Sequence, residues 1–172
     1  MDLDAALDLI AEIPDFPQPG VLFRDLSPLF ASGPGFTAVT GALAATVEPD
    51  VDLLAAVEAR GFLLAAAIAQ ARSLGVVLVR KPGKLPSVAG RVDYALEYGT
   101  ATLELPSNVV APGARVAVVD DVLATGGTVN AACRLLETSG AVVAGVSVVL
   151  ELAALDGRAA LGGRKIDALH TV

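Results

Sequence analysis

The segment from Arg115 to Thr128, RVAVVDDVLATGGT, constrains the fold of this chain more than any other. It contains an apolar run rich in β-branched residues over 116–119, which is typical of a strand buried on both faces of a sheet. Two adjacent carboxylates, Asp120 and Asp121, follow this run, and a helical pattern begins after the TGGT loop. The segment therefore predicts a buried strand with two acids at its carboxyl end and a small-residue loop that opens a helix.

The TGGT loop has the composition of an anion-binding loop. Gly126 and Gly127 lack a Cβ, so their backbone N–H groups can approach an anion closely. The helix that follows adds unpaired N–H groups and the positive end of its dipole, and Thr125 and Thr128 can donate from their hydroxyls. An ordinary strand-to-helix turn with an N-cap threonine is the structural alternative.

The acid pair requires a different ligand, because two carboxylates repel phosphate. Ribose hydroxyls, bound directly or through a hydrated Mg2+, are natural partners for Asp120 and Asp121. Together, the acids and the glycine loop have the parts of a sugar-phosphate site.

Length and composition limit the class of protein. With 172 residues, one domain is expected. The net charge of −7 argues against nonspecific nucleic-acid binding, and the single cysteine allows no intrachain disulfide. The amino terminus has no signal-peptide pattern and no apolar run is long enough to span a membrane. We therefore expect a cytoplasmic protein that binds neither nucleic acid nor membrane.

Further along the chain, the pattern indicates a βαβ unit. A buried strand is predicted over 51–57, a helix over 63–72 and a second strand over 76–80, which implies parallel strands with a right-handed crossover. Another strand is predicted over 142–150 and a short amphipathic helix over 4–10. Ligands of such sheets bind at the carboxyl ends of strands.

Basic residues follow two of these strand ends. Arg60 lies after the first strand, and the loop RKPGKLP, residues 80–86, follows the second. Within this loop Lys81 and Lys84 could neutralise part of a diphosphate. A solvated charged surface is the alternative interpretation of the loop, and a surface residue at a helix start is the alternative for Arg60.

The run VVDDVLATGGT closely resembles the phosphoribosyl-diphosphate signature of type I phosphoribosyltransferases. FPQPGVLFRDLSP, residues 16–28, resembles the FPxPGxxFRDxSP segment of adenine phosphoribosyltransferases, and LEYGT, residues 96–100, is similar to their catalytic lid. The resemblance extends from Ile13 to Leu161. By it, the chain is identified as a member of the adenine phosphoribosyltransferase family.

This resemblance implies a fold and an assembly. The fold would be the α/β fold of type I phosphoribosyltransferases, with a central, mainly parallel sheet of about five strands flanked by helices. The whole chain, 1–172, would form one domain, with a small N-terminal hood over about 1–35, a core over about 36–172 and a flexible hairpin lid over about 85–104. Family members are homodimers, so a homodimer is expected.

The resemblance also implies which residues bind substrate. Asp120 and Asp121 would hold the ribose hydroxyls. The 5′-phosphate would lie in the loop formed by Ala124, Thr125, Gly126, Gly127 and Thr128. The diphosphate would be bound by Arg60, Lys81 and Lys84, with Mg2+ held mainly by substrate and water and by no direct protein ligand. Adenine would contact Leu22, Phe23, Arg24 and Leu152. The alternative for Phe16 and Phe23 is that both side chains fill space in the hydrophobic core.

Two features of the implied site depend on local detail. EARGF, residues 58–62, resembles the pyrophosphate loop, although many relatives have serine where this chain has Ala59, so a hydroxyl contact there is lost. Relatives place a cis peptide without proline in this loop, and we expect one within 58–60. Glu97, on the lid, would act as the general acid or base for the purine proton.

The implied reaction joins adenine N9 to C1′ of 5-phosphoribosyl-1-diphosphate and yields AMP and diphosphate. Two alternatives remain open at this point. A phosphoribosyltransferase for another base would keep the acid pair and TGGT but need not keep FRD and LEYG. A nonenzymatic regulator could bind the same ligand as a signal and dispense with Glu97 and Arg60.

Overall fold

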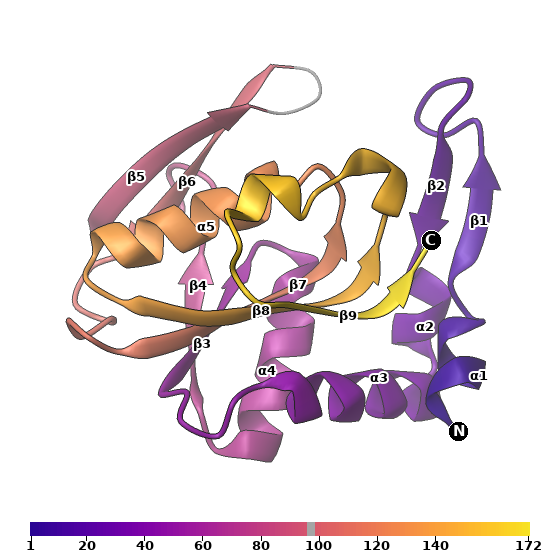
Figure 1. The fold of residues 1–172 in the computed structure, drawn as a ribbon, viewed down its shortest axis with the longest axis horizontal. Helices are drawn as coiled ribbons and strands as arrows, with labels where there is room; N and C mark the ends of the chain where they lie inside the picture. Colours follow the sequence, from indigo (N-terminus) through magenta and orange to yellow (C-terminus); the bar gives the residue numbers. More distant parts are fainter. Residues whose placement is uncertain (96–98) are drawn as a thin grey trace. The chain divides into compact units, whose positions relative to one another are not determined.

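The structure is a computed structural model that describes residues 1–95 and 99–172 (Figure 1). The chain divides into two compact units, Met1–Ala42 and Leu43–Val172. No helix among the described residues is long and apolar enough to cross a membrane.

The larger unit is built on a five-stranded sheet in which every neighbouring pair of strands is parallel. The predicted α/β architecture is therefore confirmed. In spatial order the strands are β4 (Gly75–Val79), β3 (Leu53–Val57), β7 (Arg115–Leu123), β8 (Val142–Glu151) and β9 (Ile166–Thr171). The sequence did not predict β9.

Helices cover both faces of this sheet. Figure 1 shows α5 (Gly127–Thr138) on one face and α4 (Arg60–Arg72) on the other. Because successive strand residues point to opposite faces, Ala55 and Val57 of β3 join the apolar cluster of α5. Cys133 is a fully buried member of this cluster, and burial raises the pKa of its thiol to about 11.

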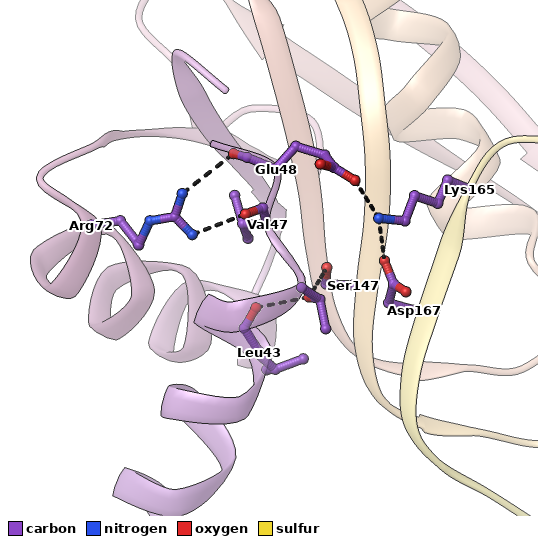
Figure 2. A network of polar contacts seen from close by, with 8 residues as sticks. Leu43, Val47, Glu48, Arg72, Ser147, Lys165 and Asp167 are labelled. Atoms are coloured by element: carbon purple, nitrogen blue, oxygen red, sulfur yellow. Dashed lines mark hydrogen bonds and ion pairs between the residues drawn. The ribbon is translucent and has the colours of Figure 1, made fainter. Parts of the chain in front are cut away.

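The last turn of α3 (Gly33–Thr46) is fixed to α4 and β8 by polar contacts (Figure 2). The hydroxyl oxygens of Thr46 and Ser147 lie 2.7 Å apart. At the end of α4, Arg72 Nη1 donates to the carbonyl oxygens of Ala44, at 2.6 Å, and Val47, at 2.9 Å. A guanidinium at a helix end satisfies carbonyls that lack intrahelical partners.

A two-stranded antiparallel hairpin projects from the larger unit. Its strands are β5 (Val88–Ala95) and β6 (Thr100–Pro106). The pairing of these strands begins at Val88, which lies opposite Pro106. Residues 96–98, between the two strands, lie outside the described part of the chain.

The smaller unit contains secondary structure that the sequence did not predict. The helix predicted over 4–10 is shorter, since α1 (Leu3–Leu7) ends before the chain turns into β1 (Ala11–Pro14). This strand pairs antiparallel with β2 (Leu22–Asp25), and α2 (Ser27–Ala31) follows. The proline- and glycine-rich segment between β1 and β2 therefore forms the end of a hairpin.

Candidate active site

The two acids lie on the central strand of the sheet. We predicted that Asp120 would end this strand, but β7 continues to Leu123, because Asp120 pairs with Val148 and Leu123 with Glu151 of β8. Asp120 is 9% exposed and Asp121 only 4%. Both carboxylates are therefore held by the sheet itself and not by a loop.

The environment of Asp120 disfavours its charged form. Burial raises the pKa of this carboxyl well above its usual range, and the charge of Asp121 raises it further. The backbone N–H of Asp121 donates to Asp120 Oδ1 at 2.9 Å and opposes the shift, as does the charge of Arg60. A proton is therefore retained on Asp120 to a higher pH than on an ordinary aspartate.

The amino terminus of α4 packs closely against the acid pair. The sequence predicted that this helix begins at residue 63, but it begins at Arg60, whose Nε lies 2.5 Å from Asp121 Oδ2. A Cβ at Gly61 would lie 3.0 Å from both Asp120 Oδ1 and the carbonyl oxygen of Val119. Glycine at position 61 therefore lets the helix lie close to β7, where a side chain would be tightly confined.

Arg60 and Asp121 form an ion pair without a hydrogen bond. The distance is short, but the geometry is not that of a donated hydrogen bond, and buried Asp121 Oδ2 has no hydrogen-bond donor among the described residues. The Arg60 side chain is 53% exposed and that of Asp121 only 6%, so Arg60 can move away from the pair while Asp121 stays in place. A buried carboxylate oxygen with an unfilled acceptor position fits a ligand hydroxyl.

The loop after β7 is shaped by two glycines. Gly126 has a φ of +81° and is the N-cap of α5, where no side chain caps the helix. A Cβ at Gly127 would lie 3.0 Å from the carbonyl oxygen of Ala95 on the hairpin. The alternative of a threonine N-cap is therefore wrong, and the first N–H groups of α5 lack a side-chain partner that would compete with an anion.

Gly157 and Arg158, near the end of the chain, support this loop. The sequence did not predict this role. A Cβ at Gly157 would collide with the carbonyl oxygen of Ala124, and one at Gly126 would collide with that of Gly157. Arg158 holds the segment to β8 through two 2.7 Å hydrogen bonds to buried Glu151, and these bonds lower the pKa of the Glu151 carboxyl. The signal available in the sequence was the glycine and arginine of LDGR, residues 155–158.

The basic loop follows β4, the edge strand next to β3. Lys81 and Lys84 are exposed and flank a turn. The preceding Arg80 binds Glu58 through its Nε, at 2.9 Å, and its guanidinium lies 5.9 Å from the centre of the Phe62 ring. Arg80 thus fixes the loop EARGF, in which the Glu58–Ala59 peptide is cis, as predicted.

The proposed adenine-contacting segment lies in the smaller unit. Phe23 meets Phe16 edge to face, with ring centres 5.1 Å apart, and Arg24 forms an ion pair with Glu12 of β1. Neither ring is buried, since Phe23 is partly exposed and Phe16 is 51% exposed. The alternative that both phenylalanines fill space in the hydrophobic core is therefore wrong. Leu22 is also exposed, at 45%.

Comparison with known proteins places this site in a family. A model of the phosphoribosyl transferase domain matches residues 30–160. Adenine phosphoribosyltransferase of Saccharopolyspora erythraea is 61% identical over 157 residues, which cover 91% of this chain and 85% of that protein. This chain belongs to the adenine phosphoribosyltransferase family. The enzyme of that name from Clavibacter michiganensis subsp. michiganensis is 56% identical over 98% of this chain and 96% of its own length.

Solved structures of adenine phosphoribosyltransferases have the same fold. The crystal structure from Thermoanaerobacter pseudethanolicus matches with a TM-score of 0.94 and 43% identity, and 99% of each chain is covered. The protein from Saccharomyces cerevisiae, solved with adenine and an imino-altritol bisphosphate, matches with a TM-score of 0.88 and 34% identity over 96% of this chain and 98% of its own.

Of the two remaining site residues, the structure describes Leu152 but not Glu97. Leu152, the adenine-contacting candidate of the core, directly follows β8, is partly exposed, and donates its backbone N–H to Leu123 at 2.9 Å. Glu97, the candidate proton carrier, lies outside the described residues.

Proposed function

We propose that this protein is an adenine phosphoribosyltransferase that transfers the 5-phosphoribosyl group of 5-phosphoribosyl-1-diphosphate to adenine, giving AMP and diphosphate. The proposal rests on one observation. Two buried carboxylates lie on β7, and the loop after this strand leads into α5, whose first turn contains glycine and has no side-chain cap. The carboxylates suit sugar hydroxyls and the start of the helix suits a phosphate, and only a few residues separate the two.

The 5′-phosphate is bound by the loop Ala124–Thr128. The N–H groups at the start of α5 supply donors and a positive dipole end, and the missing Cβ atoms of Gly126 and Gly127 let Gly157 and Ala95 pack against the loop. Thr125 and Thr128 add hydroxyl donors. Anchoring the phosphate fixes one end of the sugar, which reduces the orientation entropy that must be lost before reaction.

The ribose hydroxyls are held by Asp120 and Asp121. The orphaned Asp121 Oδ2 accepts from one hydroxyl, while protonation of Asp120 depends on pH through its raised pKa. No group of three metal-ligating side chains occurs in the described part of the chain, and the acid pair suits a hydrated ion whose direct ligands are substrate oxygens and water. An Mg2+ ion held in this way would supply positive charge that offsets the charge of the diphosphate.

Departure of the diphosphate precedes bond formation at C1′, so positive charge develops on the ribose while negative charge leaves. Arg60, Lys81 and Lys84 stabilise the leaving group. Arg60 suits this task because its half-exposed guanidinium is held at the acid pair by an ion pair that can rearrange. Lys81 and Lys84 remain exposed on a loop whose start is fixed through Arg80.

Adenine is bound by Leu22, Phe23, Arg24 and Leu152, a set of contacts that rests on the resemblance of their segments to the family. Glu97 takes the proton that adenine loses as N9 bonds to C1′, and returns it in the reverse reaction. Exclusion of water by the hairpin protects the cationic sugar from hydrolysis.

We also propose a domain organisation, an assembly and a cellular location for this protein. Residues 1–172 act as one phosphoribosyltransferase domain with a hood over about 1–35 and a lid over about 85–104, by resemblance to the family. The protein works as a homodimer, and it acts in the cytoplasm in purine salvage.

The test of the reaction is a panel of bases. The protein is incubated with 5-phosphoribosyl-1-diphosphate, Mg2+ and, separately, adenine, guanine, hypoxanthine, xanthine or orotate, and each nucleotide is identified by mass and chromatography. AMP from adenine is the expected main product. A different nucleotide as the main product, or none with any base, would contradict the proposal.

A further inference from the structure

A buried carboxylate at the root of the hairpin connects the hairpin to the basic loop. Glu104 of β6 is 1% exposed and is among the most deeply buried charged residues of the described chain. Its Oε1 lies 2.5 Å from Nη2 of Arg91, which is opposite on β5, and its Oε2 accepts the backbone N–H of Gly83 at 3.3 Å. Burial of a carboxylate is costly unless such partners satisfy it.

The backbone of Glu104 fixes the start of the same loop. Its carbonyl oxygen accepts the N–H of Arg80 at 3.0 Å, and its own N–H donates to the carbonyl oxygen of Arg80 at 2.7 Å. Glu104 therefore binds the loop at two places, once at Arg80, directly after β4, and once in the middle of the turn that follows.

That turn carries both lysines of the loop. The sequence Lys81-Pro82-Gly83-Lys84 has proline second and glycine third, and Gly83 has a φ of +79°, which are the features of a type II turn. Such a turn brings its first and fourth residues close together. The N–H that Glu104 accepts belongs to the third residue, so the carboxylate restrains the peptide between the two lysines.

Charge alone does not explain an acid at this place. A carboxylate beside a loop that binds an anion lowers the positive potential there, even when Arg91 partly compensates it. Geometry does explain it, because an anionic acceptor holds an N–H more strongly than a neutral one.

We propose that Glu104 is a positioning residue for diphosphate: it holds the Lys81–Lys84 turn in the orientation in which both ammonium groups face the leaving group. This inference rests on the proposed function, since it assigns the anion that the turn receives. It predicts a ligand-selective effect, because the loop Ala124–Thr128, which takes the 5′-phosphate, has no contact with Glu104 among those described.

The test compares Glu104→Gln with the unchanged protein by calorimetry, using inorganic diphosphate with Mg2+ in one titration and AMP in another. Glutamine keeps the shape of the side chain but replaces the anionic acceptor with a neutral one, which weakens its hold on the Gly83 N–H, and we expect the dissociation constant for diphosphate to rise about tenfold. The KM for 5-phosphoribosyl-1-diphosphate should rise by a similar factor, with AMP affinity changed less than about twofold. Equal weakening of both ligands, or unchanged diphosphate affinity, would overturn the assignment.

Asp93→Asn is the matched control within the hairpin. Asp93 accepts the Thr102 hydroxyl at 2.6 Å across the same two strands and has no described contact with the loop. Its replacement should leave both affinities unchanged.

Gly83→Ala keeps the proposal testable if Glu104→Gln does not fold. A Cβ at Gly83 meets no atom within 4 Å, so alanine disturbs only the left-handed conformation of the turn. It should reproduce the selective loss of diphosphate affinity, and unchanged diphosphate binding would contradict the role of the turn. Failure of the unchanged protein to make AMP would refute the proposed function, whereas the diphosphate titrations would still decide the role of Glu104.

Discussion

Gly127 offers a sharp test of the proposed phosphate loop, because three neighbouring atoms limit the space that a side chain could occupy. A Cβ at this position would lie 3.0 Å from the carbonyl oxygen of Ala95, 3.6 Å from Tyr94 Cδ2 and 3.8 Å from the Thr125 hydroxyl. Valine would place two further methyl groups in this space. Either the hairpin or the first turn of α5 must then move.

The expected cost follows from this crowding. Inserting extra methyl groups into a packed site costs about 1–3 kcal/mol. If the first turn of α5 moves, its N–H groups no longer converge on the phosphate, and that cost appears as a loss of AMP affinity of about 5- to 150-fold. Gly127 has no positive φ, so the effect of Gly127→Val comes from lost space and not from backbone strain.

The assay is calorimetric titration of AMP and, separately, of ribose 5-phosphate, which shares only the sugar-phosphate part. Both ligands should weaken to a similar extent. Gly41→Val is the control, since a Cβ there meets nothing within 4 Å. Undiminished ribose 5-phosphate affinity in a folded Gly127→Val protein would refute the placement of the phosphate at this loop.

Further predictions follow from three carboxylates. Replacing Glu97 with glutamine should lower kcat about 10²–10⁴-fold while AMP still binds, and near-normal turnover with adenine would show that Glu97 is not the proton carrier. The pKa of Asp120 is raised by burial and then by Asp121, so the folded state binds this proton more tightly and the free energy of unfolding falls as pH rises above about 4. Asp120→Asn should therefore raise the midpoint of thermal unfolding at pH 8 but weaken AMP binding; a lower midpoint would contradict the burial argument. Arg158→Gln leaves buried Glu151 without its bidentate partner and should cost about 1–3 kcal/mol in urea unfolding, whereas no change would show that this pair contributes nothing.

The sequence predicted those features that depend on local pattern. The apolar run before Asp120 and the glycines after it specify a buried strand and a loop within 14 residues of chain, and the βαβ spacing specifies a parallel sheet. The cis peptide at Glu58–Ala59 was also predicted, from the resemblance of EARGF to a known loop.

Features that depend on contacts between distant residues were not predicted. Gly61 is required by the approach of α4 to β7, and Gly157 by the carbonyl oxygen of Ala124. The sequence marks both glycines, but it does not show the distant atoms that each of them must approach. The position of Glu104 in β6 gave no signal of its contact with Gly83, because that contact depends on the docking of a hairpin.

Errors at element boundaries have a similar cause. We expected β7 to end at Asp120, because two acids rarely continue a buried strand. Its pairing with β8 outweighs that preference and extends the strand to Leu123. The hairpin of β1 and β2 was missed because Pro14 and Gly20 interrupt the apolar alternation by which strands are predicted.

The central claim is that one site, on β7 and the loop that follows it, binds the sugar and phosphate during transfer to adenine. The most direct measurement is a crystal structure of the protein with AMP and diphosphate. We expect the 5′-phosphate to lie against the N–H groups of Thr125–Thr128, the ribose hydroxyls to contact Asp120 and Asp121, and the diphosphate to lie beside Arg60. An AMP phosphate bound elsewhere, with the start of α5 free of ligand, would contradict it.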